Sequence, residues 1–291
     1  MGVVPMDKQI AIITGAGSGI GRAIAIALTS DGYHVALIGR NRKRLEETLE
    51  IVEKSKGVGS IHSGDVTVSA EVTTIFEDIS KLGGQVAILV NNAGHLLVKP
   101  IMETTESELR ELLDVHVIAT LLCTQKAVPL MQKNKYGRIV NVVSAMGQGA
   151  SEFTSHYQAA KAAQHSFSKS SAIAFRKDGI TVNSVSPTTI DTEVFHSNDA
   201  NYKKYLGHTA ADELAKRQTS TAKGLIGADE VARLCVYLRK LEVVFYIIRV
   251  YLLYLLIRGR RLLVGLHPEV DISLGPPCGG IVREELDGLV E

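Results

Sequence analysis

The chain has 291 residues, of which 45% are hydrophobic, and its 32 Lys and Arg residues nearly balance 31 Asp and Glu residues. A chain of this length can bury a full core as one large α/β domain or as two small ones. The balanced charge excludes the general basic field of a nucleic-acid-binding protein, so we expect no nucleic acid partner.

The cysteines and the N-terminus indicate a cytoplasmic protein. Cys123, Cys235 and Cys278 are an odd number at wide spacing, which suits buried thiols in a reducing compartment and predicts no metal site. Asp7 and Lys8 directly precede an apolar run, so this end lacks the pattern of a secretory signal.

The first predicted elements are a strand over residues 9–14, a glycine-rich turn, and a helix that runs to residue 30. Glycines permit close backbone approach, and the start of the helix offers free N–H groups and a positive dipole end to a pyrophosphate. A purely structural turn is the alternative, but the position before alternating strands and helices favours phosphate binding. The candidate cofactor-binding residues of this segment are Thr14, Gly15, Gly17, Ser18, Gly19, Ile20 and Gly21.

The second predicted strand, residues 33–38, ends in a basic residue. Arg40 follows it, and Arg42 and Lys43 begin the next helix. An acidic residue at this place would hold the ribose 2′-hydroxyl of NAD, whereas an arginine suits the 2′-phosphate of NADP. Arg40 therefore favours NADP(H) over NAD(H), while Arg42 and Lys43 are better explained as a solvated helix start.

Further strands alternate with helical segments along the chain. They are predicted over residues 58–62, 86–90, 138–143 and 180–185, and polar turns follow them. This alternation predicts a doubly wound parallel sheet, with helices on both faces and ligands beyond the carboxyl ends of the strands.

A hydroxyl, a phenol and an amine lie close together in residues 144–161. Tyr157 and Lys161 are four apart, so in a helix beginning near Ser155 they share one face, where the ammonium can depress the pKa of the phenol. The predicted strand 138–143 delivers Ser144 to the same edge of the sheet. The Tyr and Lys pair alone is weak evidence, because such pairs are common on solvated helices.

Taken in order, these motifs resemble the classical short-chain dehydrogenase/reductase family over about residues 7–240. Residues 14–21 look like its cofactor turn, Asp65 like its adenine contact and residues 91–94 like its fourth-strand motif. Residues 157–161 look like its catalytic motif, and the thirteen-residue spacing from Ser144 to Tyr157 is also usual in the family. The resemblance implies a Rossmann-type three-layer α/β/α fold in a single domain.

The resemblance also implies hydride transfer between a nicotinamide cofactor and a carbonyl or alcohol carbon. Ser144 would stabilise the developing oxyanion, Tyr157 would be the general acid/base, and Lys161 would hold the nicotinamide ribose. The further cofactor contacts that it implies are Asp65, Val66, Asn92, Ala93, Gly94, Tyr157, Lys161, Pro187 and Thr192. The partners expected by analogy are a small carbonyl or alcohol substrate and further copies of the chain, in a dimer or tetramer.

Two positions in the predicted site depart from the family pattern. His116 stands where the family usually has an asparagine. In the family this asparagine helps to hold a water that passes protons to the lysine, partly through its backbone carbonyl. His116 is a candidate catalytic residue as an extra proton carrier, but a hydrogen-bonded helix residue is the favoured interpretation. Thr188 replaces the glycine that usually follows Pro187.

The region after the sixth strand is predicted to cover the substrate. Residues 192–224 are polar, contain Tyr202 and His208, and occupy the place of the family's substrate lid. His156 is a candidate for the pocket wall, because it lies about 100° around the helix from Tyr157.

The largest departure begins near residue 241. Residues 243–257 are apolar but include Arg249, and fifteen residues fall short of the about twenty that cross a bilayer, so no membrane span is expected. An interfacial helix is an alternative. We favour an unusual ending, either a substitute for the seventh strand or a poorly folded extension, and treat 241–291 as an atypical segment after a catalytic domain of residues 7–240.

The combined prediction is an NADP(H)-dependent oxidoreductase with an open choice of substrate. A β-ketoacyl thioester reductase, a polyol or sugar dehydrogenase and a steroid-type carbonyl reductase all share these motifs. An NAD-dependent polyol or alcohol dehydrogenase is one alternative. Another is a dinucleotide-binding regulatory protein with little or no turnover, although the intact Ser144, Tyr157 and Lys161 argue for an enzyme.

Overall fold

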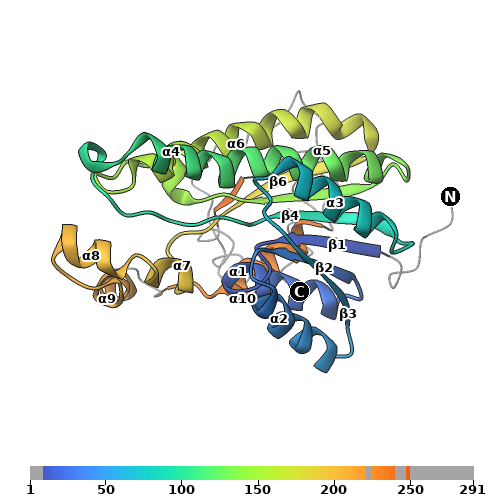
Figure 1. The fold of residues 1–291 in the computed structure, drawn as a ribbon, viewed down its shortest axis with the longest axis horizontal. Helices are drawn as coiled ribbons and strands as arrows, with labels where there is room; N and C mark the ends of the chain where they lie inside the picture. The colour runs from blue at the N-terminus through green and yellow to red at the C-terminus, as the bar shows by residue number, and fades with distance from the viewer. Residues whose placement is uncertain (1–8, 221–224, 240–246, 250–291) are drawn as a thin grey trace, which may run out of the picture.

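One parallel sheet runs through the part of the chain that this computed structural model describes, namely residues 9–220, 225–239 and 247–249 (Figure 1). Its strands are β1 (Gln9–Thr14), β2 (His34–Gly39), β3 (Val58–Ser63), β4 (Gln85–Asn91), β5 (Gly137–Val142), β6 (Ile180–Ser186) and β7 (Ile247–Arg249). Their order is β3-β2-β1-β4-β5-β6-β7. The order reverses between β1 and β4, which is where a doubly wound sheet opens a crevice for ligands.

The strands form because short runs of aliphatic and β-branched residues are buried on both faces. In β1, Ile10, Ala11, Ile12 and Ile13 are all at most 2% exposed. Such continuous apolar runs are typical of parallel strands covered by helices on either side. The six strands predicted between residues 9 and 185 are confirmed, and each predicted end lies within one residue of the observed one.

Helices cover both faces of the sheet, which confirms the three-layer architecture (Figure 1). One layer contains α1 (Gly19–Ser30), α2 (Arg42–Lys54) and α10 (Ala228–Leu238), whose buried residues share a hydrophobic cluster with one face of the sheet. The other contains α3 (Ser69–Ser80), α5 (Ala119–Gln132) and α6 (Ser155–Phe175), which share a second cluster with the opposite face. Cys123 and Cys235 are buried in these two clusters, and Cys278 lies outside the described residues.

A third, smaller group of helices lies beyond the sheet at one end of the molecule (Figure 1). It comprises α7 (Glu193–His196), α8 (Asp199–Leu206) and α9 (Ala210–Ser220). Phe195, Tyr202 and Leu214 pack with Val98, from the segment after β4, in a separate small core. Asn198 fastens the group to the same segment, because it accepts the N–H of Val98 at 2.9 Å through its side chain. The predicted lid, as far as residue 220, is therefore a small helical unit.

Shorter helical turns connect the main elements. They are α4 (Glu106–Leu113), η2 (Ile101–Glu103), η4 (Ala145–Gln148), η5 (Arg176–Asp178) and the π-helical turn η3 (Asp114–Ile118). In η3 the N–H of Ala119 bonds to the carbonyl of Asp114, five residues back, so the path from α4 to α5 is locally widened. His116 lies in the middle of this turn.

The described part of the atypical C-terminal segment is a strand. Ile247–Arg249 pairs in parallel with Ser184, Val185 and Ser186 of β6. The alternative of an interfacial helix is therefore wrong for these three residues, and the rest of 241–291 lies outside the described residues. Within the described ranges, no helix is long and apolar enough to cross a bilayer.

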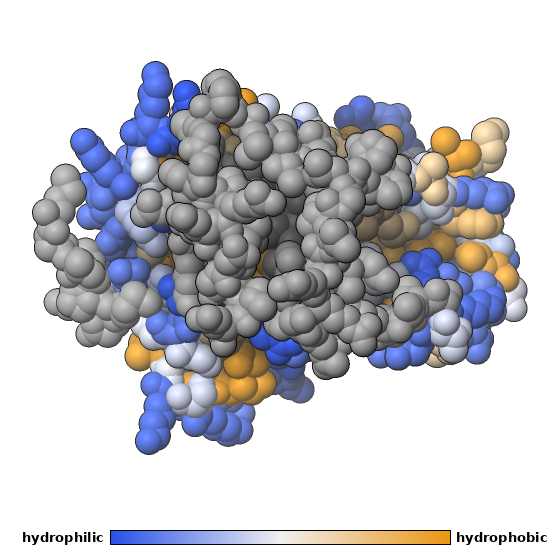
Figure 2. All heavy atoms as spheres, turned by 180° about the vertical axis from the view of Figure 1, so that it is seen from behind, coloured by the Kyte–Doolittle hydropathy of each residue, from blue (hydrophilic) through white to orange (hydrophobic). Residues whose placement is uncertain are grey.

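The face opposite to the view of Figure 1 is mainly hydrophilic where its residues are described, with small hydrophobic groups between the charged ones (Figure 2). Among the described residues, the most exposed large hydrophobic side chains are Met102, at 91%, Ile173, at 71%, and Ile101, at 65%. Met102 and Ile101 lie in the short turn η2, whereas Ile173 lies near the end of α6.

Candidate active site

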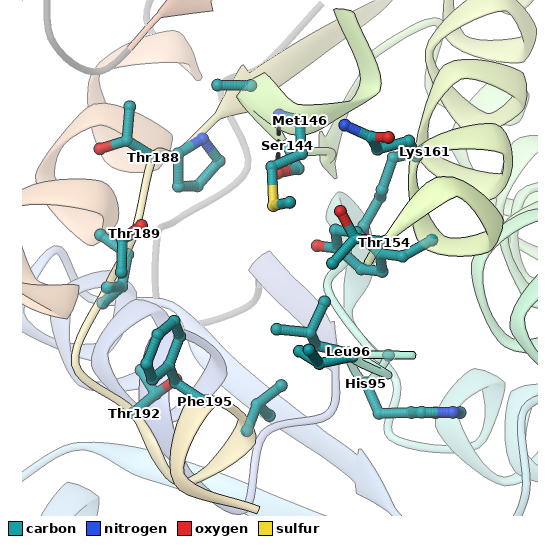
Figure 3. Close-up of a pocket in the computed structure, with 18 of the residues that line it drawn as sticks. His95, Leu96, Ser144, Met146, Thr154, Lys161, Thr188, Thr189, Thr192 and Phe195 are labelled. Atoms are coloured by element: carbon teal, nitrogen blue, oxygen red, sulfur yellow. Dashed lines mark hydrogen bonds between the residues drawn. The ribbon is translucent and has the colours of Figure 1, made fainter. Parts of the chain in front are cut away.

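A cavity of about 640 Å³ opens at the carboxyl edge of the sheet, beside the reversal between β1 and β4. Figure 3 shows Lys161 of α6 on one side of it, with Thr188, Thr189 and Phe195 on the other. The predicted site residues that line the cavity are Gly15, Ser18, Gly19, Ile20, Asn92, Ala93, Gly94, His116, Ser144, Tyr157, Lys161, Pro187 and Thr192. Segments more than 170 residues apart in the chain thus meet in one place, because the parallel strands all end there.

The glycine turn between β1 and α1 fits an anion. Gly15 has a φ of +66°, and a Cβ at Gly21 would lie 2.2 Å from the carbonyl oxygen of Gly15, so a side chain at Gly21 would collide with the turn. Ser18 precedes α1 but makes no side-chain cap, and the first turn of this 12-residue helix contains no acidic residue. Its N–H groups and its positive dipole end are therefore available to a phosphate.

Thr14 and Asn92 hold the turn in place from behind. The Thr14 hydroxyl accepts the N–H of Asn92 at 2.9 Å and that of Ala93 at 3.0 Å. The Asn92 side-chain amide in turn donates to the carbonyl of Thr14 at 3.0 Å. Thr14 is buried and lies outside the cavity lining, as do Gly17 and Gly21. Thr14, Gly17 and Gly21 therefore support the glycine turn and do not line the cavity.

Arg40, Asp65 and Val66 form a separate part of the predicted site, at the ends of β2 and β3 and outside the cavity lining. Arg40 Nη1 lies 3.7 Å from Asp65 Oδ2, and its side chain is 75% exposed. Partial burial raises the pKa of Asp65, but hydrogen bonds from Thr67 and the charge of Arg40 outweigh it, so the pKa is lowered overall. Asp65 is thus a carboxylate beside the exposed guanidinium of Arg40.

Ser144, Tyr157 and Lys161 converge as the sequence predicts. Ser144 directly follows the end of β5 and its Oγ accepts the N–H of Met146 at 3.2 Å. Tyr157 and Lys161 lie in the first two turns of α6, with the Lys161 Nζ 5.8 Å from the centroid of the Tyr157 ring. Lys161 is almost fully buried and donates to the Val142 carbonyl at 2.8 Å.

Burial controls the titration of this group. It raises the pKa of Tyr157 to about 12, although a hydrogen bond with Ser144 works in the opposite direction. It lowers the pKa of Lys161 to about 7. The prediction that Lys161 depresses the pKa of the phenol is therefore wrong for these side chains by themselves. Burial removes water from both side chains and so disfavours their charged forms. At their separation, the attraction between ammonium and phenolate is too weak to offset this desolvation.

His116 lies against the phenol. Its ring meets that of Tyr157 edge-on, with 5.4 Å between centroids and an interplanar angle of 81°. Its Nε2 bonds to the carbonyl of His95 at 2.9 Å, so the proton is on Nε2 because a carbonyl only accepts. The buried Nδ1 has no hydrogen-bond partner among the described residues. Burial, helped by Lys161, lowers the pKa of His116 well below its ordinary value, so the ring is neutral.

Gly94 leaves the space that His116 fills. A Cβ at Gly94 would lie 2.2 Å from Cε1 of the His116 ring. A side chain at position 94 would therefore collide with the ring of His116, so packing requires glycine at this position of the fourth-strand motif.

His156 does not line the cavity, and its interpretation as a pocket-wall residue is wrong. Its Nε2 bonds to the carbonyl of Leu97 at 2.9 Å, and its Nδ1 lies 3.3 Å from the hydroxyl of Thr104. The side chain is buried against the segment after β4, which it ties to α6.

Sequence reasoning missed most of the substrate side of the cavity. Its walls are largely apolar and come from the lid, from η4 and from the segments before α6 and after β4: Leu96, Val98, Met146, Phe153, Val194, Phe195 and Leu206. The charged lining residues Glu213 and Arg217 are bonded to each other, with Arg217 Nε donating to Glu213 Oε1 at 2.7 Å. The apolar residues scattered through a polar lid were the available signal.

Comparison with known proteins agrees with this geometry. A sequence profile described as "short chain dehydrogenase" matches residues 9–203. An uncharacterized oxidoreductase of Staphylococcus saprophyticus is 34% identical over 205 residues, which are 70% of this chain and 88% of that protein. A relative described in the same words from Staphylococcus aureus strain MW2 is 32% identical over 201 residues, or 69% of this chain and 86% of its own length.

Solved structures show the same architecture. L-Sorbose reductase from Gluconobacter frateurii, complexed with NADPH and L-sorbose, superposes with a TM-score of 0.76 at 28% identity and covers 84% of this chain and 96% of its own. An actinorhodin polyketide ketoreductase with NADPH gives a TM-score of 0.79 at 23% identity, over 85% of this chain and 98% of its own. The fold and the site define an oxidoreductase of the Rossmann type. The chain belongs to the classical short-chain dehydrogenase/reductase family.

Proposed function

We propose that this protein is an NADP(H)-dependent carbonyl reductase in which Tyr157 is the general acid. The observation that carries the proposal is the convergence of Ser144, Tyr157 and Lys161 on one cavity whose other end is the glycine turn. A hydride acceptor bound beside Tyr157 would lie in the same enclosed space as a dinucleotide bound at Ser18.

The chain offers a fitting set of groups along the length of a dinucleotide. The uncapped start of α1, from Ser18 to Ile20, would hold the pyrophosphate, and Asp65 would accept from the adenine amine. Lys161 would hold the nicotinamide ribose, and Pro187 and Thr192 would flank the nicotinamide. When bound, the nicotinamide supplies the hydride that the protein itself lacks.

Two observations support NADP(H) over NAD(H). Arg40 directly follows β2, and its exposed guanidinium makes a long contact to Asp65, its one salt bridge among the described residues, so it can turn toward a 2′-phosphate. L-Sorbose reductase, a structural neighbour at 28% identity, was solved with NADPH.

In the reductive direction Tyr157 would supply the proton to the substrate oxygen. Burial raises the pKa of its phenol, which fits a group that carries its proton before the transfer. The Ser144 hydroxyl, 3.2 Å from the Met146 N–H, lies where it can stabilise negative charge on the substrate oxygen. Lys161 would orient the cofactor ribose and, when protonated, favour the phenolate that remains after the transfer.

The cavity walls favour a carbonyl group with mainly apolar substituents. Leu96, Phe153, Val194 and Phe195 line the same cavity as Tyr157. We also propose that residues 7–240 form the catalytic domain, that residues 192–224 form its lid, and that the protein acts as a cytoplasmic homo-oligomer, the last by family analogy.

A second candidate function is dinucleotide binding with little turnover. The observation that favours it is His116, which packs its ring against Tyr157 where the family usually has the smaller asparagine.

NADPH oxidation separates these functions. Purified protein is mixed with NADPH and a panel of apolar ketones and aldehydes, and absorbance at the nicotinamide band is followed. We expect turnover that Tyr157→Phe abolishes while NADPH binding, measured by fluorescence, stays within about twofold. NADPH binding without turnover of any carbonyl would contradict the proposed reductase and support the binding protein.

A further inference from the structure

A series of hydrogen bonds between buried side chains connects Lys161 to the π-helical turn that contains His116. The Lys161 Nζ donates to Gln164 Oε1 at 3.0 Å, Gln164 Nε2 donates to Thr120 Oγ1 at 2.9 Å, and Thr120 Oγ1 donates to the His116 carbonyl at 2.8 Å. Gln164 is 1% exposed and Thr120 is 2% exposed. The three bonds therefore form a connected path that is closed to bulk water.

The carbonyl of His116, at the end of this path, determines which group is the donor in each of the three hydrogen bonds. A carbonyl oxygen only accepts, so the Thr120 hydroxyl must give its hydrogen to His116. The same hydroxyl then accepts from the amide nitrogen of Gln164, which turns the amide oxygen toward Lys161. Neither flipping the amide nor rotating the hydroxyl keeps all three bonds. The path thus presents an oxygen, and no donor, to the lysine.

This arrangement favours a charged lysine at a place where burial disfavours it. Gln164 Oε1 and the Val142 carbonyl accept two of the three N–H groups of an ammonium, which leaves the third for the cavity. Successive bonds that point the same way polarise one another, so the oxygen facing Lys161 is a stronger acceptor than an isolated amide.

The titratable groups around Lys161 give no competing explanation. Tyr157, on the same helix, is a phenol at neutral pH, and His116 faces the lysine from the π turn as a neutral ring with His95 behind it. The neighbouring end of β5 contributes the carbonyl of Val142. Among the described residues, no salt bridge joins a carboxylate to Lys161.

We propose that Gln164 is a positioning residue that acts with Thr120 to hold Lys161 as an oriented ammonium. The proposal rests on the proposed function, because an oriented ammonium serves the ribose contact and Tyr157. In this chain two side chains take the place between the lysine and the helix turn where the family resemblance implies a water. The substitution of asparagine by His116 then costs the site little, since the link uses the main-chain carbonyl of residue 116.

The direct test is the protonation of Lys161, observed by NMR of lysine labelled at Cε, with Lys161→Arg used to assign the signal. Gln164→Met keeps the length of the side chain but removes the acceptor, so the titration midpoint of Lys161 should fall by about one pH unit, a tenfold change in the equilibrium. Gln164→Glu places a carboxylate there, and the midpoint should rise. Thr120→Val should lower it by less than Gln164→Met.

Ser168→Ala is the matched control. Ser168 is equally buried one turn further along α6, but its hydroxyl bonds to the carbonyl of Gln164 and to Asn141. It should leave the midpoint of Lys161 unchanged. Thermal unfolding identifies any variant that does not fold. If one of Gln164→Met, Gln164→Glu and Thr120→Val does not fold, the shifts of the other two decide the question.

Opposite shifts for Gln164→Met and Gln164→Glu support the proposal, and the pH profile of kcat should move in the same two directions. Unchanged midpoints in both variants, or shifts of the same sign, would overturn it. Because the NMR titration needs no turnover, a wild-type protein that binds NADPH but reduces nothing would refute the proposed function and still leave this measurement decisive.

Discussion

Arg40 gives a sharp test of cofactor choice. It is the basic residue at the end of β2, its side chain is 75% exposed, and its nearest charged contact is Asp65 at 3.7 Å. Because this contact is long and exposed, Arg40→Ala should leave the stability of the protein nearly unchanged, since such pairs contribute at most about 1 kcal/mol. Any effect on cofactor binding can then be assigned to the ligand.

The expected magnitude follows from the kind of bond that is lost. A hydrogen bond between a guanidinium and a phosphate contributes about 1.5–3 kcal/mol, and exposure places Arg40 near the lower end. Loss of about 1.5–2 kcal/mol weakens NADPH roughly 10- to 30-fold. NADH has no 2′-phosphate, so its dissociation constant should change by less than about threefold, which is a change in binding free energy of less than ~1 kcal/mol.

The assay is titration of both reduced cofactors, followed by the change in their own nicotinamide fluorescence on binding, in wild type, Arg40→Ala and Arg42→Ala. Arg42 is a suitable control because it is equally basic and nearby but is paired with Glu46 at 2.9 Å on the surface of α2. Equal weakening of NADPH and NADH by Arg40→Ala, or an equal effect of Arg42→Ala, would refute the assignment of Arg40 to the 2′-phosphate.

Three further substitutions test other parts of the site and fold. Ser144→Ala should lower kcat roughly 100- to 1000-fold, the usual effect of losing one oxyanion donor, without weakening NADPH, and an unaltered kcat would show that the oxyanion is held elsewhere. Gly21→Ala should lower the melting temperature and weaken NADPH, because its Cβ would lie 2.2 Å from the Gly15 carbonyl; unchanged binding would mean that the turn is not the pyrophosphate site. Glu108 bonds to Lys99 at 2.8 Å and has a pKa lowered from 4.5 to about 2, so its stabilisation is complete above pH 4.5 and is lost as the pH falls toward 2. Glu108→Gln should cost about 1 kcal/mol near neutral pH after screening and should flatten that acid dependence in urea unfolding, whereas a parallel pH profile would contradict the assignment.

The order of the motifs made the fold and the centre of the site predictable. Continuous apolar runs such as residues 9–14 identify strands because burial on both faces requires them, and parallel strands carry their following residues to one edge. Ser144 was placed in this way, whereas Tyr157 and Lys161 were found by their helical spacing and by the family resemblance. The structure places all three in the cavity lining.

The remaining features depend on tertiary contacts that spacing does not encode. The pKa of Tyr157 is raised by burial, so the i, i+4 spacing to Lys161 gave the wrong direction. His156 turned away to Leu97 because a helix position fixes a direction but not the neighbour found there. Gln164 lies three residues after Lys161, and only its contact with Thr120 of α5 shows why a buried amide is needed.

The position of the lid in the chain was predicted from the sequence, but its three short helices and their small core were not. Phe195 and Tyr202 belong to different short helices and meet in a small core that also contains Val98, from the segment after β4. A polar composition hides such a core, since few apolar residues suffice to join three short helices.

The central claim is that this chain moves a hydride from a nicotinamide to a carbonyl carbon with Tyr157 as proton donor. The most direct measurement is a single-turnover reaction with NADPH dideuterated at C4, followed by mass spectrometry of the alcohol. Wild-type protein should give an alcohol one mass unit heavier, with deuterium on the carbinol carbon, and Tyr157→Phe should bind the same cofactor and give none. An alcohol without deuterium on carbon, or undiminished product from Tyr157→Phe, would contradict the account.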